Sequence, residues 1–111
     1  MKDESAYLRH ILECSKAVQG YVAEGRGAFH QDRRTQKAVL RELQELSESL
    51  QHISQETKEK HPEIPWRDIS AFRNVLVHDY LGINLDRIWE IIHEDLPPLV
   101  EKIKHVIPNH E

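Results

Sequence analysis

The stretch of residues 72–80, FRNVLVHDY, has three side chains suited to chemistry around an apolar centre: Arg73, His78 and Tyr80. A histidine has an ordinary pKa of about 6.5, so it can accept or donate a proton near neutral pH. An arginine stays charged and can make two parallel hydrogen bonds to a phosphate group. Together these residue types favour proton transfer at an anionic substrate.

Each of these residues also has a simpler structural interpretation. His78 could sit near the negative end of a helix dipole, Arg73 could pair with a nearby carboxylate, and Tyr80 could pack on the bundle with its hydroxyl in water. An arginine followed five residues later by a histidine is expected by chance about half a time in a chain of this composition. The spacing alone therefore decides nothing, and the surrounding residues carry the argument.

Four segments with apolar residues at helical spacing hold this stretch in place, and turn-forming glycines and prolines separate them. The segments cover residues 8–22, 32–53, 65–82 and 85–106. Asn84 is the expected cap of the last segment, which Pro97 and Pro98 must kink or interrupt. Because no segment alternates with period two for long, the pattern predicts one all-α domain over residues 1–111, an antiparallel four- to five-helix bundle.

Composition limits the class of protein further. The 111 residues carry a net charge of -4 and a single cysteine, Cys14, which excludes a disulfide within the chain and favours a reducing compartment. The first ten residues have no apolar signal-peptide core, and no apolar run approaches the length of a membrane span. The sequence therefore predicts a cytoplasmic protein with no membrane association.

The chain has eight histidines, and they could form a metal site only if their spacing suited one. Only His105 and His110 lie three to five residues apart, and there is no HExxH motif and no pairing of a cysteine with a histidine. The pattern predicts no metal site and no cofactor.

The second segment has two further features. Basic residues recur at helical spacing on its first turns, at Arg33, Arg34, Lys37 and Arg41. They form either a solvated face paired with nearby glutamates or a contact for a phosphate backbone. The apolar residues form a narrow seam with a period close to 3.5, which packing inside the bundle explains most simply and a helical dimer face explains alternatively.

The residues around the opening stretch resemble the HEPN superfamily, and within it the HepT-like toxins. The family motif Arg-x4-His-x-Tyr is met by Arg73, His78 and Tyr80, and residues 64–66 and 83–89 are similar to the family's flanks. The family's Ile-Gly-Glu-Ala corresponds to residues 46–49, where the glutamate, Glu48, is kept and the glycine is not. Ser70-Ala71 stands where relatives commonly have a glycine.

The resemblance implies a dimerising helical bundle that is a metal-independent endoribonuclease acting on RNA. It also implies a toxin paired with a small nucleotidyltransferase antitoxin, which neutralises it by adenylylating the motif tyrosine, Tyr80. Arg73 and His78 would be the catalytic residues, with Asn74 and Glu48 supporting them or positioning the substrate. Asp79 has no assigned role.

Helix geometry constrains how the motif can work. Residues five apart on a straight helix point about 140° away from each other, so Arg73 and His78 do not share a face. Either the helix distorts near residues 77–79, or motifs from two subunits face each other in one cleft, and we favour the composite site. The alternative to an enzyme is a non-catalytic helical module that regulates a nucleotidyltransferase or presents substrate to it.

Overall fold

A computed structural model describes residues 4–67 and 84–107. Within these ranges every regular element is helical. The elements are α1 (Glu4–Tyr21), α2 (Arg26–Gln31), α3 (Arg33–Gln51), α4 (Gln55–Lys60), α6 (Leu85–Glu90), the π-helical turn η1 (Ile91–Asp95) and α7 (Leu96–Val106). The predicted all-α class is confirmed.

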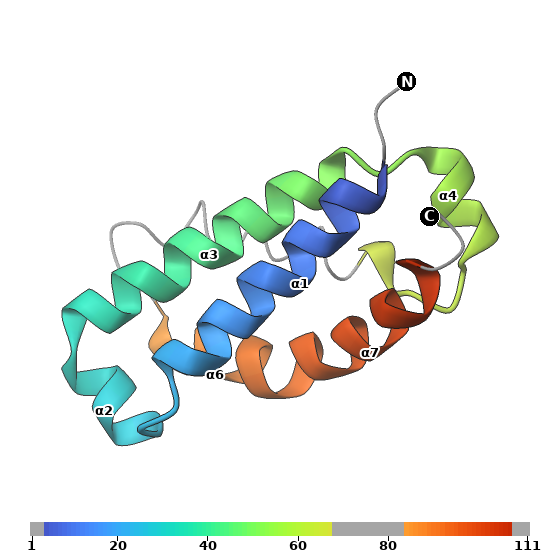
Figure 1. The fold of residues 1–111 in the computed structure, drawn as a ribbon. Helices are drawn as coiled ribbons and strands as arrows, with labels where there is room; N and C mark the ends of the chain where they lie inside the picture. The colour runs from blue at the N-terminus through green and yellow to red at the C-terminus, as the bar shows by residue number, and fades with distance from the viewer. Residues whose placement is uncertain (1–3, 68–83, 108–111) are drawn as a thin grey trace.

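The long helices form an antiparallel bundle (Figure 1). Helix α3 runs back along α1, and the continuous rod α6–η1–α7 runs antiparallel to α1 beside it. The short helices α2 and α4 lie at opposite ends of α3. These three rods bring their apolar faces together in one core.

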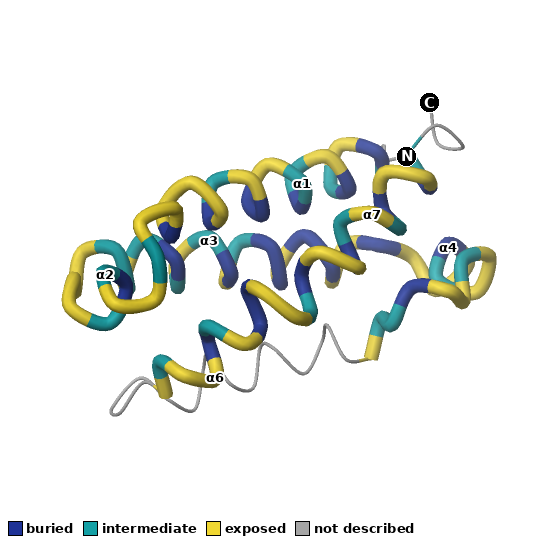
Figure 2. Tube along the Cα trace, turned by 90° about the horizontal axis from the view of Figure 1, so that it is seen from below, coloured by how far each residue is buried: buried dark blue, intermediate teal, exposed yellow. Residues whose placement is uncertain are grey.

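The core is made by the predicted apolar positions. Buried residues line the inner sides of the helices, while the outer sides are exposed (Figure 2). Fully buried members include Leu8, Ile11 and Val18 of α1, Val39, Leu43 and Leu46 of α3, and Ile92, Leu96, Leu99 and Ile103 of the third rod. Phe29, Ile64 and Ile91 are also buried but were not predicted, because the first two lie in short segments without a helical repeat.

The narrow apolar seam of α3 packs within the chain. Val39, Leu43, Leu46 and Leu50 are all buried, and among the described helices α1 packs most extensively on α3. The simpler interpretation of the seam is confirmed, and the alternative that it forms a helical dimer face is wrong.

Local signals explain where several helices begin. The Asp32 side chain accepts a hydrogen bond from the Arg34 amide at 3.0 Å at the start of α3, and the hydroxyl of Thr35 donates to the same carboxylate at 2.8 Å. The Thr35 hydrogen bond is the main reason why the pKa of Asp32 lies below its usual range. The predicted cap Asn84 accepts from the Arg87 amide at 3.0 Å and starts α6.

The two prolines interrupt the regular α ladder of the last helix, as predicted, while the rod stays helical throughout. Both lie in the first turn of α7, where a missing amide hydrogen and the proline ring disturb the regular ladder. The chain responds with the wider π turn η1, in which the Leu96 amide donates to the Ile91 carbonyl five residues earlier.

Helices α2 and α4 differ from the sequence prediction, which gave a turn at the glycines and no helix after Ile53. Gly25 has a φ of 100°, a conformation that favours glycine, and it caps α2. Ser54 caps α4 by accepting from the Thr57 amide at 3.1 Å. Each helix has only six residues, too few for a periodic pattern to reveal.

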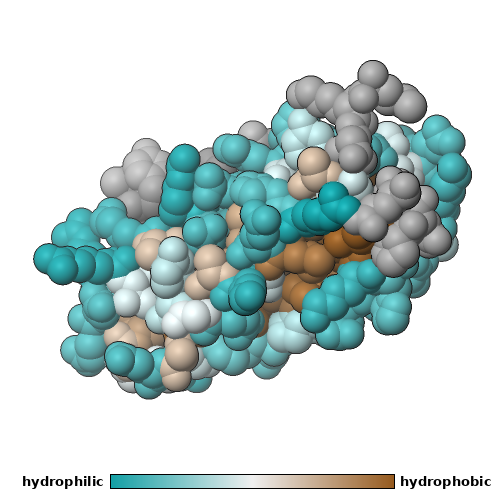
Figure 3. All heavy atoms as spheres, viewed as in Figure 1, coloured by the Kyte–Doolittle hydropathy of each residue, from teal (hydrophilic) through white to brown (hydrophobic). Residues whose placement is uncertain are grey.

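The face drawn in Figure 3 is mostly hydrophilic, with apolar atoms gathered in a hollow between α1 and α7. In the part of the chain that the structure describes, no helix combines the length and apolar character needed to cross a membrane.

Removal of the α6 cap gives a direct test of the fold next to the motif. Asn84→Ala removes the acceptor for the Arg87 amide and is expected to lower the free energy of unfolding by about 0.5–2 kcal/mol. Chemical denaturation monitored by circular dichroism measures the change. Asn84→Asp keeps an acceptor and should stay close to wild type; an equal loss in both variants would show that the cap does not stabilise α6.

Candidate functional site

The predicted motif lies entirely outside the described residues. Arg73, Asn74, His78 and Tyr80, together with Asp79, fall within residues 68–83, whose structure is not described. The remaining candidate, Glu48, is exposed on the last turns of α3. The described residues on both sides of the motif therefore define where it enters and leaves the bundle.

The residues directly before the motif are held in place by packing and by a hydrogen bond. Ile64 is buried, and the indole nitrogen Nε1 of Trp66 donates to the His61 carbonyl at 3.0 Å. Trp66 and Arg67 are already helical directly after Pro65, a residue that suits the start of a helix. This agrees with the predicted start of the motif helix at Pro65, and the rest of that helix lies outside the described residues.

The residues directly after the motif, at the start of α6, are held in place by contacts with α2. The Asp86 carboxylate accepts from Arg26 Nη2 at 2.7 Å and faces His30 Nε2 at 2.9 Å, both on α2. The Arg26 hydrogen bond, followed by that of His30, holds the pKa of Asp86 below its usual range. Asp86 is thus ionised at neutral pH and links α6 to α2.

Glu48 lines a hollow of about 330 Å³ between α1 and α3. The other lining residues are Ala6, Tyr7, His10, Glu45, Ser49 and His52. The rings of Tyr7 and His52 stack across the two helices, with centroids 4.5 Å apart and planes 10° apart. Glu48, predicted as a supporting residue, therefore lies among two histidines and a tyrosine that the sequence did not single out.

His10 connects this hollow to the only cysteine of the chain. Its Nδ1 lies 2.6 Å from Ser49 Oγ, and its Nε2 lies 3.6 Å from Cys14 Sγ. The expectation that no cysteine pairs with a histidine is wrong, since one helical turn joins these two residues. The His-x3-Cys spacing could have revealed the pair, but Glu45 comes from α3 and only the fold brings it near.

A second hollow, of about 540 Å³, lies beside the entry to the motif. It is lined by Gln55, Lys58, Glu59, Pro62, Trp66 and Arg67. Two cations and an indole ring in one hollow provide groups that can contact a phosphate and stack on a base.

Family comparison decides the class of protein. The family described as Ribonuclease HepT-like matches residues 11–106, a range that contains Glu48 and the whole Arg-x4-His-x-Tyr motif. The chain belongs to the HepT-like ribonuclease family. The resemblance to HEPN proteins is thereby confirmed at the level of the family.

Curated relatives of the HepT-like chain carry ribonuclease names. "Putative RNase MJ0127" of Methanocaldococcus jannaschii is 32% identical over 99% of this chain and 92% of its own length. "Putative RNase TTE0752" of Caldanaerobacter subterraneus subsp. tengcongensis is 32% identical, with 96% of each chain covered. "Probable ribonuclease HepT" of Thermococcus cleftensis is 34% identical over 88% of this chain and 90% of its own. No solved structure matches the chain significantly.

The basic strip of this HepT-like chain is solvent-exposed. Arg33, Arg34, Lys37 and Arg41 all lie on the outer side of α3, and Arg41 Nη2 is 3.9 Å from a Glu45 carboxylate oxygen. This one ion pair agrees with the interpretation of the strip as a solvated face paired with glutamates. A role of the strip in holding a phosphate backbone stays a prediction.

Proposed function

We propose that this protein is a metal-independent endoribonuclease and the toxin of a toxin–antitoxin pair. The observation that carries the proposal is the complete Arg-x4-His-x-Tyr motif within the range matched by the ribonuclease family. Expression of the wild-type chain alone is expected to arrest bacterial growth. Growth equal to that of an empty vector, with the protein present in soluble form, would contradict the toxin assignment.

The motif residues supply the chemistry that RNA cleavage needs without a metal. The 2′-OH of the RNA attacks the adjacent phosphorus, and the bond to the 5′-oxygen breaks. His78 transfers a proton in this step, since a neutral imidazole accepts and an imidazolium donates near neutral pH. Arg73 binds the phosphate oxygens and stabilises their growing negative charge, and Asn74 orients the phosphate or His78.

Two subunits complete the site in this proposal. One histidine accepts the proton of the 2′-OH, and a second histidine donates a proton to the leaving 5′-oxygen. Because Arg73 and His78 point about 140° apart on a straight helix, two facing motifs bring the required groups into one cleft. The dimer does not use the apolar seam of α3, which is buried within the same chain.

RNA approaches the motif across the hollow that holds Lys58, Trp66 and Arg67. This hollow has room for a nucleotide and lies directly before the motif in the chain. Although the chain has a net charge of -4, Lys58 and Arg67 outnumber the one carboxylate of the hollow, Glu59, and leave it with a local excess of positive charge.

Charge removal at this hollow tests the path of the RNA. Lys58→Ala and Arg67→Ala are each expected to weaken binding of single-stranded RNA and to reduce the slope of log affinity against log salt by about 0.7–1. Fluorescence anisotropy on a His78→Ala background, which does not degrade the probe, measures both quantities. Lys60→Ala is the matched control, because Lys60 shares α4 with Lys58 but pairs with Glu56 outside the hollow. Equal effects of Lys58→Ala and Lys60→Ala would reject the hollow as an RNA contact.

The partner in this proposal is a small nucleotidyltransferase that transfers AMP to Tyr80. The added group brings bulk and negative charge next to Arg73 and His78, so it occupies the phosphate position and repels RNA.

The second candidate is a non-catalytic helical module that regulates a nucleotidyltransferase or presents substrate to it. The net charge of -4 favours this candidate, because nonspecific RNA binding requires positive charge. The two candidates differ in whether purified protein that carries no AMP cleaves RNA.

A further inference from the structure

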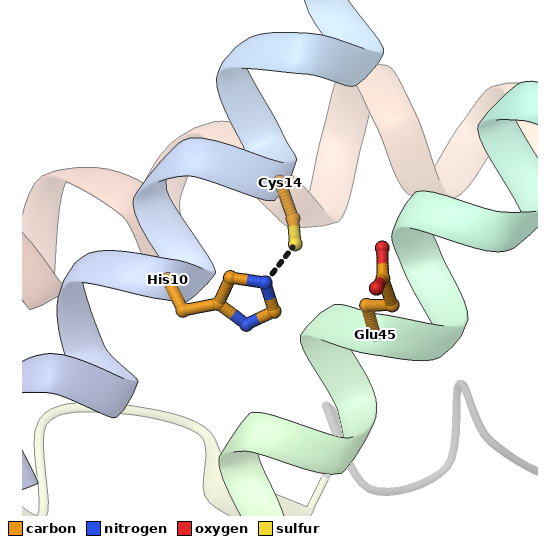
Figure 4. A group of neighbouring side chains, drawn as sticks. All are labelled: His10, Cys14 and Glu45. Atoms are coloured by element: carbon orange, nitrogen blue, oxygen red, sulfur yellow. Dashed lines mark hydrogen bonds between the residues drawn. The ribbon is translucent and has the colours of Figure 1, made fainter.

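We propose that His10, Cys14 and Glu45 form a binding site for a thiophilic divalent cation, with Zn²⁺ as the natural fit. Figure 4 shows the three side chains extending into the space between α1 and α3. One ligand atom from each, an imidazole nitrogen, a thiol sulfur and a carboxylate oxygen, lies within 4.8 Å of the other two. These are the donor types of zinc sites, and three protein ligands leave the fourth tetrahedral position for water.

The spacing of the two α1 ligands fits a tetrahedral zinc site. His10 Nε2 and Cys14 Sγ are 3.6 Å apart. Zinc bonds of about 2.0–2.1 Å to nitrogen and 2.3 Å to sulfur, at a tetrahedral angle, separate nitrogen and sulfur by roughly 3.6 Å. The separation of these two atoms therefore matches the one that a shared zinc ion requires.

The hydrogen bond between His10 and Ser49 orients the ring for this role. Ser49 Oγ lies 2.6 Å from Nδ1, and this contact turns Nε2 toward Cys14. When Nδ1 donates to the serine oxygen, Nε2 presents its lone pair to the metal. A second hydrogen bond of this kind commonly fixes the ring of a metal-binding histidine.

Glu45 brings the third ligand from the neighbouring helix. Its side chain is about one-third exposed, at 35%, and its only ion pair among the described residues is the 3.9 Å contact with Arg41. A pairing of this length at the surface is weak, so the carboxylate can turn toward the metal at little cost. A metal held in this way joins α1 to α3.

Negative charge around Cys14 favours a cation over a reactive thiolate. The pKa of the Cys14 thiol is raised to about 12. Burial is the largest cause, followed by the charge of Glu42 and a hydrogen bond to it, and then by the charges of Glu45 and Glu13. Without a metal the thiol is thus protonated at neutral pH, the form in which a cysteine is a poor nucleophile. A divalent cation reverses this balance, because it binds the thiolate, releases one proton to solvent and neutralises the surrounding carboxylates.

Cobalt binding tests the site with a signal that reports on a single residue. Because Cys14 is the only cysteine, a thiolate-to-cobalt charge-transfer band in the near ultraviolet can arise only there. We expect this band when Co²⁺ is added to reduced, metal-stripped wild-type protein, and we expect Zn²⁺ to remove it. Absence of the band at saturating Co²⁺ would overturn the proposal.

Ligand variants separate this site from the other histidines. Cys14→Ser should abolish the band, and His10→Ala and Glu45→Gln should each weaken Co²⁺ binding at least tenfold, as measured in titrations followed at the band. His105→Ala is the control and should bind like wild type, because His105 is exposed on α7 and does not belong to the cluster. Circular dichroism verifies that each variant is folded. Unchanged binding in folded His10→Ala and Glu45→Gln would also overturn the proposal.

Discussion

Replacement of His78 by alanine is expected to lower the rate of RNA cleavage by about 10²–10⁴-fold, the usual contribution of a positioned proton-transfer group. Replacement of Arg73 by alanine should cost about 10²–10³-fold, because the charge that develops on the phosphate loses its main partner. Single-turnover cleavage of a labelled RNA by protein made without its partner measures both rates. Expression of either variant should also leave growth unaffected.

Two exposed residues provide matched controls for these substitutions. His105→Ala and Arg9→Ala remove the same residue types from exposed positions of α7 and α1, so they should keep the wild-type cleavage rate. If His78→Ala were as toxic and as active as wild type, the assignment of His78 to proton transfer would be wrong. A loss of activity in the controls would instead indicate a general effect of removing surface charge.

Tyr80→Phe is expected to keep the toxicity of the protein but to prevent its neutralisation by the partner nucleotidyltransferase. Phenylalanine keeps the ring but lacks the hydroxyl that accepts AMP, so the variant should still cleave RNA and arrest growth, while co-expression of the partner nucleotidyltransferase no longer rescues the cells. In wild type, mass spectrometry of the co-expressed protein should find one or more added AMP masses on the peptide that contains Tyr80.

The other two tyrosines serve as controls for the modification. Tyr7 stacks on His52 and Tyr21 is exposed at the end of α1, and neither peptide should gain mass. Rescue of the Tyr80→Phe strain by the partner, or rescue of wild type without any gain in mass, would show that the antitoxin acts by binding alone.

Helical periodicity predicted most of the framework. Most of the predicted apolar positions of α1, α3 and α7 are buried, while Leu12, Leu40 and Val100 are partly buried. Asn84 caps α6, and the prolines interrupt the regular α ladder of the last helix because a proline lacks the amide hydrogen that the ladder needs. The short helices α2 and α4 could not be predicted in the same way. Their starts depend on a glycine with positive φ and on a serine cap, and neither helix has a repeat.

The candidate sites differ in the same way: some consist of residues that are close in sequence, and others of residues that only the tertiary fold brings together. The motif residues are close in sequence, so the pattern Arg-x4-His-x-Tyr and the family comparison could identify them without a structure. His10 and Cys14 are also close, but the partner Glu45 is more than thirty residues away. The hollow around Glu48 likewise joins residues of two helices, and only their antiparallel packing brings these residues together.

The central claim, that this protein cleaves RNA by itself without a metal, is tested most directly in one assay. Wild-type protein free of AMP, verified by its mass, is incubated with a labelled RNA in excess EDTA, and His78→Ala protein is assayed beside it. Cleavage that persists in EDTA and disappears in the variant is the predicted result. Intact RNA with the wild-type protein, or cleavage that EDTA abolishes both in wild type and in Cys14→Ser protein, which lacks the thiolate of the proposed zinc site, would contradict the claim.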